Sequence, residues 1–162
     1  MLRYQGAAIV LQEVPDEISL AINISNCPYR CIGCHSKSLR EDIGIPLAKD
    51  FLILLEKYQG LITCVCFMGD GGDQLALLGY ILASQQRGIK TCLYTGSDKI
   101  VHTNLMLLCR YLDYIKIGHY EPKYGGLSSK TTNQRMYQIE HCKDEDRLTD
   151  ITHKFWKDYE KE

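Results

Sequence analysis

Short apolar runs recur along the chain, separated by intervals long enough to hold a helix. Each run is nearly continuous in its hydrophobic positions, which is typical of strands buried on both faces of a sheet. A turn signal, Asn26-Cys27-Pro28, ends the first run. The pattern predicts four strands, at Ser19–Ser25, Leu61–Phe67, Ile89–Thr95 and Tyr111–Ile117.

The intervals between these strands carry helical periodicity. After Pro46, apolar residues recur every three or four positions, and Gly60 ends the pattern. The predicted helices run from Pro46 to Gly60, over Leu75–Arg87, and from a Ser97 cap to about Arg110. Later segments predict a polar loop at Tyr120–Asn133, a strand at Arg135–Glu140 and an amphipathic end at Ile151–Tyr159.

Strands that alternate with helices at short spacing form parallel βα units with right-handed crossovers. Four such units are too few for a closed eight-stranded barrel of about 250 residues. We therefore predict an α/β fold in which residues 1–162 form one domain. Its architecture would be an open, partial (β/α) barrel with a parallel sheet, truncated relative to a full TIM barrel.

Charge and hydropathy exclude several classes of protein. Lys and Arg total 19 against 20 Asp and Glu, a net charge of −1, so the basic face of a general nucleic-acid binder is not expected. The longest apolar runs fall far short of the roughly 20 residues that span a bilayer. The N-terminus shows no basic segment followed by an apolar stretch. We expect a soluble cytoplasmic protein that binds neither nucleic acid nor membrane.

Eight cysteines then become the most informative residues, because three of them, Cys27, Cys31 and Cys34, lie within eight positions. Without a secretory signal, such a group indicates a metal site rather than a disulfide framework. Three thiolates on one loop can hold three irons of a [4Fe-4S] cluster and leave the fourth iron open to a small molecule. Gly33 relieves crowding where the backbone curls round the cluster. The other five are expected to be ordinary thiols, with Cys64 and Cys66 buried on one face of a strand.

A zinc knuckle is the alternative for the three cysteines. Zinc sites usually take four ligands in two paired groups, and only Cys31 and Cys34 form a C-x2-C pair here. His35 follows Cys34 directly and is poorly placed to share its metal. The remaining histidines, His102, His119, His141 and His153, are separated in sequence and are expected to be structural or solvated.

The C-x3-C-x2-C motif after the first strand resembles that of the radical S-adenosylmethionine enzymes. Within them, the small size, Cys34-His35-Ser36 and Thr131-Thr-Asn-Gln-Arg135 resemble the anaerobic ribonucleoside-triphosphate reductase activating proteins. The resemblance extends from Ile18 to the Phe155-Trp156 tail. It implies a [4Fe-4S] cluster on Cys27, Cys31 and Cys34, with S-adenosylmethionine bound at the open iron.

The same resemblance implies a reaction and two protein partners. A flavodoxin or ferredoxin-like donor would supply one electron, and S-adenosylmethionine would be cleaved to methionine and a 5′-deoxyadenosyl radical. That radical would remove hydrogen from a glycine of an anaerobic ribonucleotide reductase. No catalytic residue beyond the cluster is required, since the cofactor carries the chemistry.

Further residues are expected to bind S-adenosylmethionine. Gly69-Asp-Gly-Gly-Asp73 follows the second strand, and its Gly71-Gly72-Asp73 resembles the family's Gly-Gly-Glu/Asp-Pro motif, with Gln74 in place of Pro. Free N–H groups there suit the methionine carboxylate, and Asp70 or Asp73 could accept from its ammonium. By the same resemblance, Gly33, Cys34 and His35 border the adenine, and the alternative for His35 is a partly exposed loop histidine. Thr95 ends the third strand on the same edge, where it would line the ribose or belong to a plain loop. For the Gly69–Asp73 turn, the alternative is a plain capped turn with Asp73 as the N-cap.

Two other functions remain open at this point. One is activation of another glycyl-radical enzyme, or radical chemistry on a small molecule. The other is a non-catalytic iron–sulfur or zinc binding module. The short βα array favours a protein substrate, because a radical made on an open, shallow sheet can be reached by something too large to enclose.

Overall fold

The chain forms one mixed sheet of eight strands, in the order β3-β1-β2-β4-β5-β6-β7-β8. The computed structural model describes residues 1–159. At the centre of the sheet four strands run parallel: β2 (Ser19–Ile24), β4 (Cys64–Met68), β5 (Lys90–Tyr94) and β6 (Tyr114–Ile117). The predicted α/β class is confirmed.

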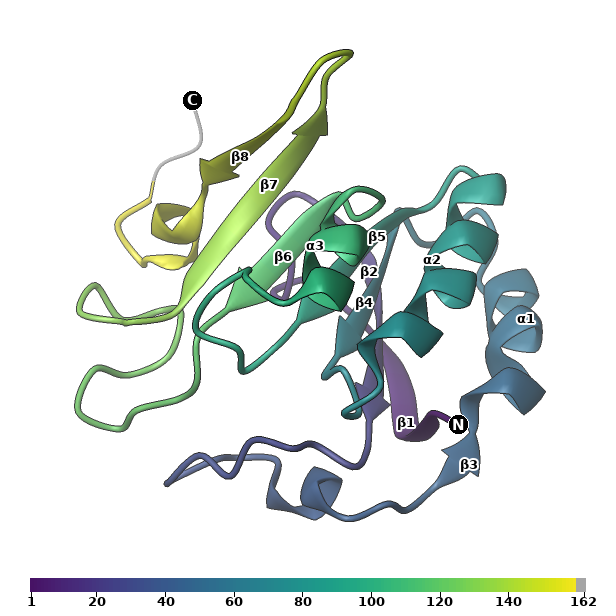
Figure 1. Ribbon diagram of the computed structural model, residues 1–162, viewed down its shortest axis with the longest axis horizontal. Helices are drawn as coiled ribbons and strands as arrows, with labels where there is room; N and C mark the ends of the chain where they lie inside the picture. The colour runs from purple at the N-terminus through teal and green to yellow at the C-terminus, as the bar shows by residue number, and fades with distance from the viewer. Residues whose placement is uncertain (160–162) are drawn as a thin grey trace.

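Helices connect the parallel strands in sequence. α1 (Leu47–Lys57), α2 (Leu77–Gln86) and α3 (Thr103–Cys109) lie on the same face of the sheet (Figure 1). Consecutive strands are neighbours, so each crossover has the same hand and every helix falls on one side. The other face is left for loops to cover.

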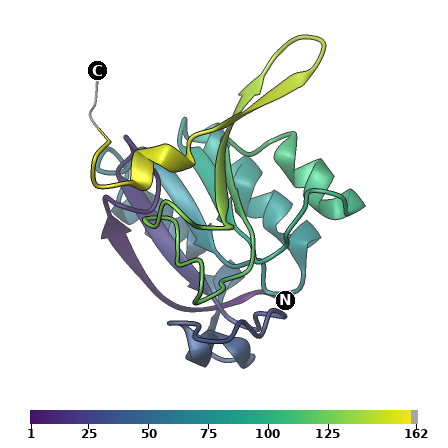
Figure 2. The same cartoon turned by 90° about the vertical axis from the view of Figure 1, so that its left-hand side faces the viewer.

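Both flanks of the sheet are antiparallel, which corrects the prediction of a parallel sheet. On one side β1 (Arg3–Val10) pairs with β2, and β3 (Ile45–Pro46) pairs with β1. On the other side β7 (Arg135–His141) pairs with β6, and β8 (Asp146–Asp150) completes a hairpin that projects from the body of the molecule (Figure 2). Antiparallel neighbours need no crossover helix, so these strands gave no βα pattern in the sequence.

Alternation along each strand builds two cores. On β4, Val65 and Phe67 pack under the helices, whereas Cys64 and Cys66 point to the opposite face. There they meet Cys92 and are covered by residues of the β1–β2 loop and the C-terminal segment. All three thiols are fully buried, and burial raises the pKa of Cys64 and of Cys92. The prediction that Cys64 and Cys66 are buried thiols on one face is confirmed.

The third helix is shorter than predicted. α3 begins at Thr103 instead of after Ser97. The Ser97 hydroxyl donates to the carbonyl of Lys99 at 2.8 Å, and the Ser97 N–H donates to Thr95 Oγ1 at 3.2 Å. Because the Ser97 side chain is engaged in this local turn, it does not cap a helix, and the helix begins only at Thr103.

Other boundaries also differ from the predictions. β4 begins at Cys64, because Leu61 is 61% exposed in the turn that follows α1. The second helix starts with a 3-10 turn, η2 (Gln74–Ala76). Within the predicted amphipathic end, Ile151–Tyr159, the helical structure is a single 3-10 turn, η3 (Thr152–Phe155). Within residues 1–159, no helix is long and apolar enough to cross a membrane.

Candidate functional site

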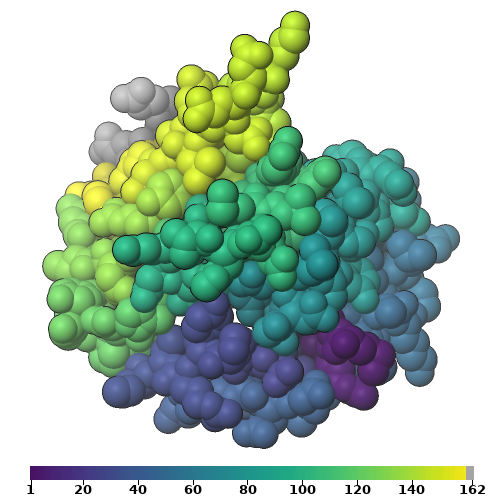
Figure 3. All heavy atoms as spheres, viewed as in Figure 1, coloured from purple at the N-terminus to yellow at the C-terminus, as the bar shows by residue number. Residues whose placement is uncertain are grey.

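A cavity of about 450 Å³ opens at the edge where the parallel strands end. This is the edge at which open α/β sheets bind ligands. The loop that follows β2 runs along it, at the bottom of Figure 1 and as the blue segment beneath the teal and green ones in Figure 3. Cys27, Cys31 and Cys34, all on this loop, line the cavity.

The three cysteines are free and half-buried. Burial raises the pKa of Cys27. The Cys34 sulfur accepts from the Ser36 N–H at 3.4 Å, and Arg40 Nη2 donates to the carbonyl of Cys31 at 2.7 Å. Among residues 1–159, no three side chains of His, Cys, Asp or Glu converge closely enough to hold a single metal ion. The three thiols line the same cavity, but they are too far apart to bind one metal ion together.

This donor set fits an iron–sulfur cluster in its chemistry. A four-iron cluster takes each thiolate on a different iron, so its ligands must face one cavity and need not converge on one ion. Three thiols provide three of the four positions. Zinc, in contrast, is bound at about 2.3 Å by four ligands that surround one point.

Close packing against neighbouring loops fixes the cysteine loop. A Cβ on Gly96 would lie 2.6 Å from Cγ of Tyr29, so the ring of Tyr29 rests directly on the Gly96 backbone. Gly33 has a φ of +75°, and a Cβ there would meet Pro122 at 3.0 Å and Tyr120 at 3.3 Å. The His35 ring lies 5.7 Å from that of Tyr120. The loop is held from both sides, after β5 and after β6.

The predicted Gly-Asp turn builds a buried network beside the cavity. Asp70 is 2% exposed and accepts hydrogen bonds from the Gly72 N–H at 3.2 Å, Gln74 Nε2 at 3.0 Å and Thr95 Oγ1 at 2.9 Å. Tyr29 Oη lies 3.4 Å from Thr95 Oγ1. Asp70 is thereby connected through Thr95 to the cysteine loop.

All the predicted ligand residues except Gly33 divide into two groups. Gly33 is not among the residues that line the cavity and lies against Pro122 and Tyr120. Cys34, His35 and Thr95 line the cavity. Asp70, Gly71, Gly72 and Asp73 form the adjoining turn, in which Asp73 caps η2 by accepting from the Ala76 N–H at 3.3 Å. Asp73 is therefore the N-cap, as the alternative interpretation had it, while Asp70 is the carboxylate joined to the cavity wall.

Lys116 is a site residue that the sequence analysis missed. It lines the cavity at the end of β6 and is 8% exposed. Its ammonium donates to the carbonyl of Gly118 at 2.8 Å and to that of Thr95 at 3.3 Å. Burial lowers the pKa of Lys116 to about 8, although the nearby Cys31 and Cys27 thiols act in the opposite direction. A lysine inside the apolar run Tyr111–Ile117 was the signal that could have identified it.

The Thr131–Arg135 segment shapes the wall opposite the cysteine loop. Its Thr132 hydroxyl donates to the carbonyl of Gly125 at 3.1 Å, Asn133 Nδ2 to that of His119 at 2.9 Å, and Gln134 Nε2 to that of Gly118 at 3.3 Å. These bonds tie down the long loop after β6. The segment therefore acts here by holding that loop in place.

Two of the histidines outside the motif, His119 and His141, are held by local partners. His119 lies 2.6 Å from Asp98 through Nδ1 and 2.6 Å from Glu121 through Nε2, and these hydrogen bonds raise its pKa. His141 contacts Asp146 and the carbonyl of Leu112. For these two, the contacts agree with the expectation of a structural role.

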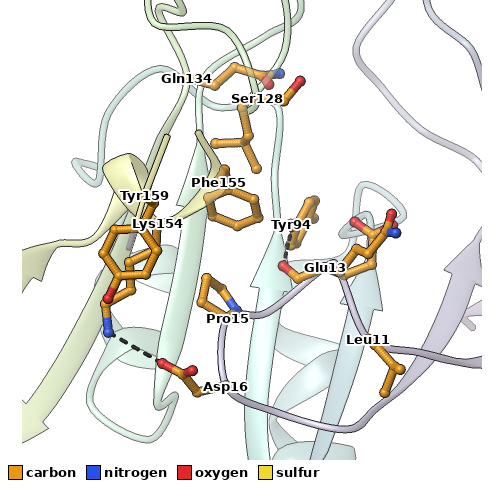
Figure 4. A pocket seen from close by; sticks show the side chains of 12 residues that line it. Leu11, Glu13, Pro15, Asp16, Tyr94, Ser128, Gln134, Lys154, Phe155 and Tyr159 are labelled. Carbon is orange, nitrogen blue, oxygen red and sulfur yellow. Dashed lines mark hydrogen bonds and ion pairs between the residues drawn. The ribbon is translucent and has the colours of Figure 1, made fainter. Parts of the chain in front are cut away.

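A second cavity of about 550 Å³ lies on the face of the sheet that the helices leave uncovered. Figure 4 shows its walls, which come from the β1–β2 loop, β5 and the C-terminal segment. The Tyr94 hydroxyl donates to the carbonyl of Glu13 at its centre. Tyr94, Ser128 and Gln134 line this cavity and the cysteine-lined one, so the two adjoin.

Neither the models of known protein families, nor curated proteins, nor solved structures match this chain, so its own cavity and side chains carry the functional argument.

Proposed function

We propose that this chain is a radical S-adenosylmethionine enzyme that activates an anaerobic ribonucleotide reductase by generating a glycyl radical on it. The observation that carries the proposal is that Cys27, Cys31 and Cys34 line one cavity at the carboxyl edge of the parallel strands. Four parallel strands with their helices on one face also agree with a partial (β/α) barrel.

The cysteines would hold a [4Fe-4S] cluster with one iron open. Such a cluster supplies the electron that cleaves S-adenosylmethionine into methionine and a 5′-deoxyadenosyl radical. The chain's own residues bind and orient the substrate. The buried Lys116 ammonium suits the methionine carboxylate. Thr95 lines the cavity where the ribose would lie, and its Oγ1 is held there by donating to Asp70 and accepting from the Ser97 N–H.

Asp70 is the carboxylate best connected to this substrate. Its two oxygens have about four acceptor positions, and three are already used by Gly72, Gln74 and Thr95. Asp70 is 2% exposed and does not itself line the cavity, so it would act on the substrate through Thr95, whose hydroxyl donates to it from the cavity wall. Because its partners fix the carboxylate in place, Thr95 would meet the substrate in a fixed orientation.

The remaining walls limit side reactions. Met68 and Tyr94 line the cavity beside the polar residues, and their apolar surfaces would reduce the number of water molecules next to a reactive radical. The adjoining second cavity provides room for a segment of a protein substrate next to the site where the radical forms. A protein substrate agrees with this open arrangement.

The test is anaerobic reconstitution with iron and sulfide, followed by addition of a reductant, S-adenosylmethionine and the reductase. We expect 5′-deoxyadenosine and the EPR doublet of a glycyl radical on the reductase. Cys31→Ala should lose the cluster, and Cys142→Ala, on an exposed cysteine, is the matched control that should keep it. Stoichiometric zinc without iron after anaerobic purification would contradict the proposal.

A further inference from the structure

The cysteine loop has a second, outer side with its own hollow. This outer hollow, of about 570 Å³, is lined by Arg30, Cys31, Ile32, Tyr120, Pro122 and Lys123, among others. Cys31 lines both the inner cavity and the outer hollow. His119 and Tyr120 line both as well, so the two adjoin, and a group bound by Cys31 would be reached from the outer hollow as well as from the inner cavity.

The outer hollow combines an apolar centre with basic residues. Ile32 is 82% exposed, although it stands between two residues of the cysteine motif. Arg30 is exposed and the Lys123 side chain is 71% exposed. An apolar centre with a charged rim is the anatomy of a protein interface, and a small one suits a transient electron-transfer complex.

The acidic groups near the hollow are engaged with local partners. Glu121 lies 3.8 Å from Lys123 and 2.6 Å from His119, and His119 also contacts Asp98. Among the residues that line the hollow, Arg30 and Lys123 are cations and Glu121 is the one carboxylate, so the lining is net positive without counting His119. The chain as a whole has a net charge of −1.

We propose that the outer hollow docks the electron donor, a small acidic electron-transfer protein, while the inner cavity holds S-adenosylmethionine. This rests on the proposed function, which requires one electron for each cleavage. One electron leaves the reduced centre of the donor and enters the cluster. The donor is oxidised by one electron, the cluster is reduced by one, and no atom or proton is transferred. Most residues that line the outer hollow do not line the inner cavity, so donor and substrate would bind at the same time.

The experiment measures binding of oxidised flavodoxin by calorimetric titration, with the cluster-free and the reconstituted protein, at low and at raised salt. Lys123→Glu and Ile32→Ser are the test variants. Lys143→Glu, an exposed lysine in the β7–β8 hairpin at the opposite edge, is the matched control. We expect Lys123→Glu to weaken binding about tenfold and to reduce its salt dependence, with the control unchanged.

A second measurement compares reductants for the reconstituted proteins. Formation of 5′-deoxyadenosine should slow in Lys123→Glu when flavodoxin is the reductant and stay at the wild-type rate with dithionite. Wild-type affinity of Lys123→Glu for flavodoxin would overturn the docking surface. If Lys123→Glu reduced radical formation on the reductase equally with dithionite and with flavodoxin, the proposal would also be overturned, because the surface would then bind the reductase. If dithionite gives no 5′-deoxyadenosine with the wild type, the proposed function fails, and the titration still decides the docking surface.

Discussion

The contact between Tyr29 and Gly96 provides a sharp test of how the cysteine loop is held. Substituting Gly96→Ala places a Cβ 2.6 Å from Tyr29 Cγ, 2.7 Å from Cδ2 and 3.1 Å from Cβ. Ordinary carbon contacts are about 3.5–4.0 Å, so the root of the side chain must move by about 1 Å. Tyr29 lies between Cys27 and Cys31, and it cannot move without displacing them.

Overpacking of this kind costs about 1–3 kcal/mol. We expect Gly96→Ala to lower the free energy of unfolding of the cluster-free chain by that amount, measured by urea denaturation under reducing conditions. Iron bound per chain after reconstitution should fall as well. In a Tyr29→Ala background most of the clash is absent, so the same substitution should cost less than about 1 kcal/mol.

Gly79→Ala is the matched control, because nothing lies within 4 Å of a Cβ at that position of α2. It should raise stability by up to about 1 kcal/mol through helix propensity. An equal cost of Gly96→Ala with and without Tyr29 would refute the reasoning, and so would a Gly96→Ala chain as stable as the wild type.

Three further predictions concern the groups round the cavity. Lys116→Met should keep the cluster but weaken S-adenosylmethionine binding more than about tenfold, measured by titration of the reconstituted protein, because the buried cation is lost. Asp70→Asn should lower the free energy of unfolding by about 1–3 kcal/mol, since an amide cannot accept hydrogen bonds from all three partners. Asp73→Asn should leave the stability nearly unchanged, because Asn also caps helices. Equal losses of stability in the two variants would contradict this prediction. Hydrogen bonds raise the pKa of His119, so its charged form stabilises the fold below pH 6.5 and that contribution disappears as pH rises through the raised pKa. Wild type should therefore lose up to about 1 kcal/mol relative to His119→Asn across this window, and parallel unfolding curves would contradict the assignment.

The sequence predicted those parts of the fold that are buried on both sides. β2, β4, β5 and β6 were recognisable because the helices cover one face and loops the other. β1 was not recognisable in the sequence. Its pairing register with β2 shifts between Tyr4 and Ala7, and buried and exposed residues do not alternate along it. β8 was missed because its residues are almost all exposed, and only pairing with β7 makes it a strand.

The candidate site was predictable where its chemistry is local. The spacing of the three cysteines on one loop predicts a shared site, and in the structure all three line one cavity. Lys116 belongs to the site through tertiary packing, because β6 happens to end beside the β2 loop. The roles of Asp70 and Asp73 depended on which carboxylate turns inward, and that is set by Thr95, 25 residues from Asp70 along the chain.

The central claim is that the three thiols hold a cluster at which S-adenosylmethionine is cleaved to make a glycyl radical. The most direct test is anaerobic EPR of the reconstituted protein with dithionite, S-adenosylmethionine and an anaerobic ribonucleotide reductase, with 5′-deoxyadenosine counted in the same sample. The account predicts a glycyl-radical doublet that depends on Cys27, Cys31 and Cys34, with 5′-deoxyadenosine formed alongside it. An iron-loaded protein that forms neither product would contradict it, and 5′-deoxyadenosine without the doublet would show that the reductase is not the substrate.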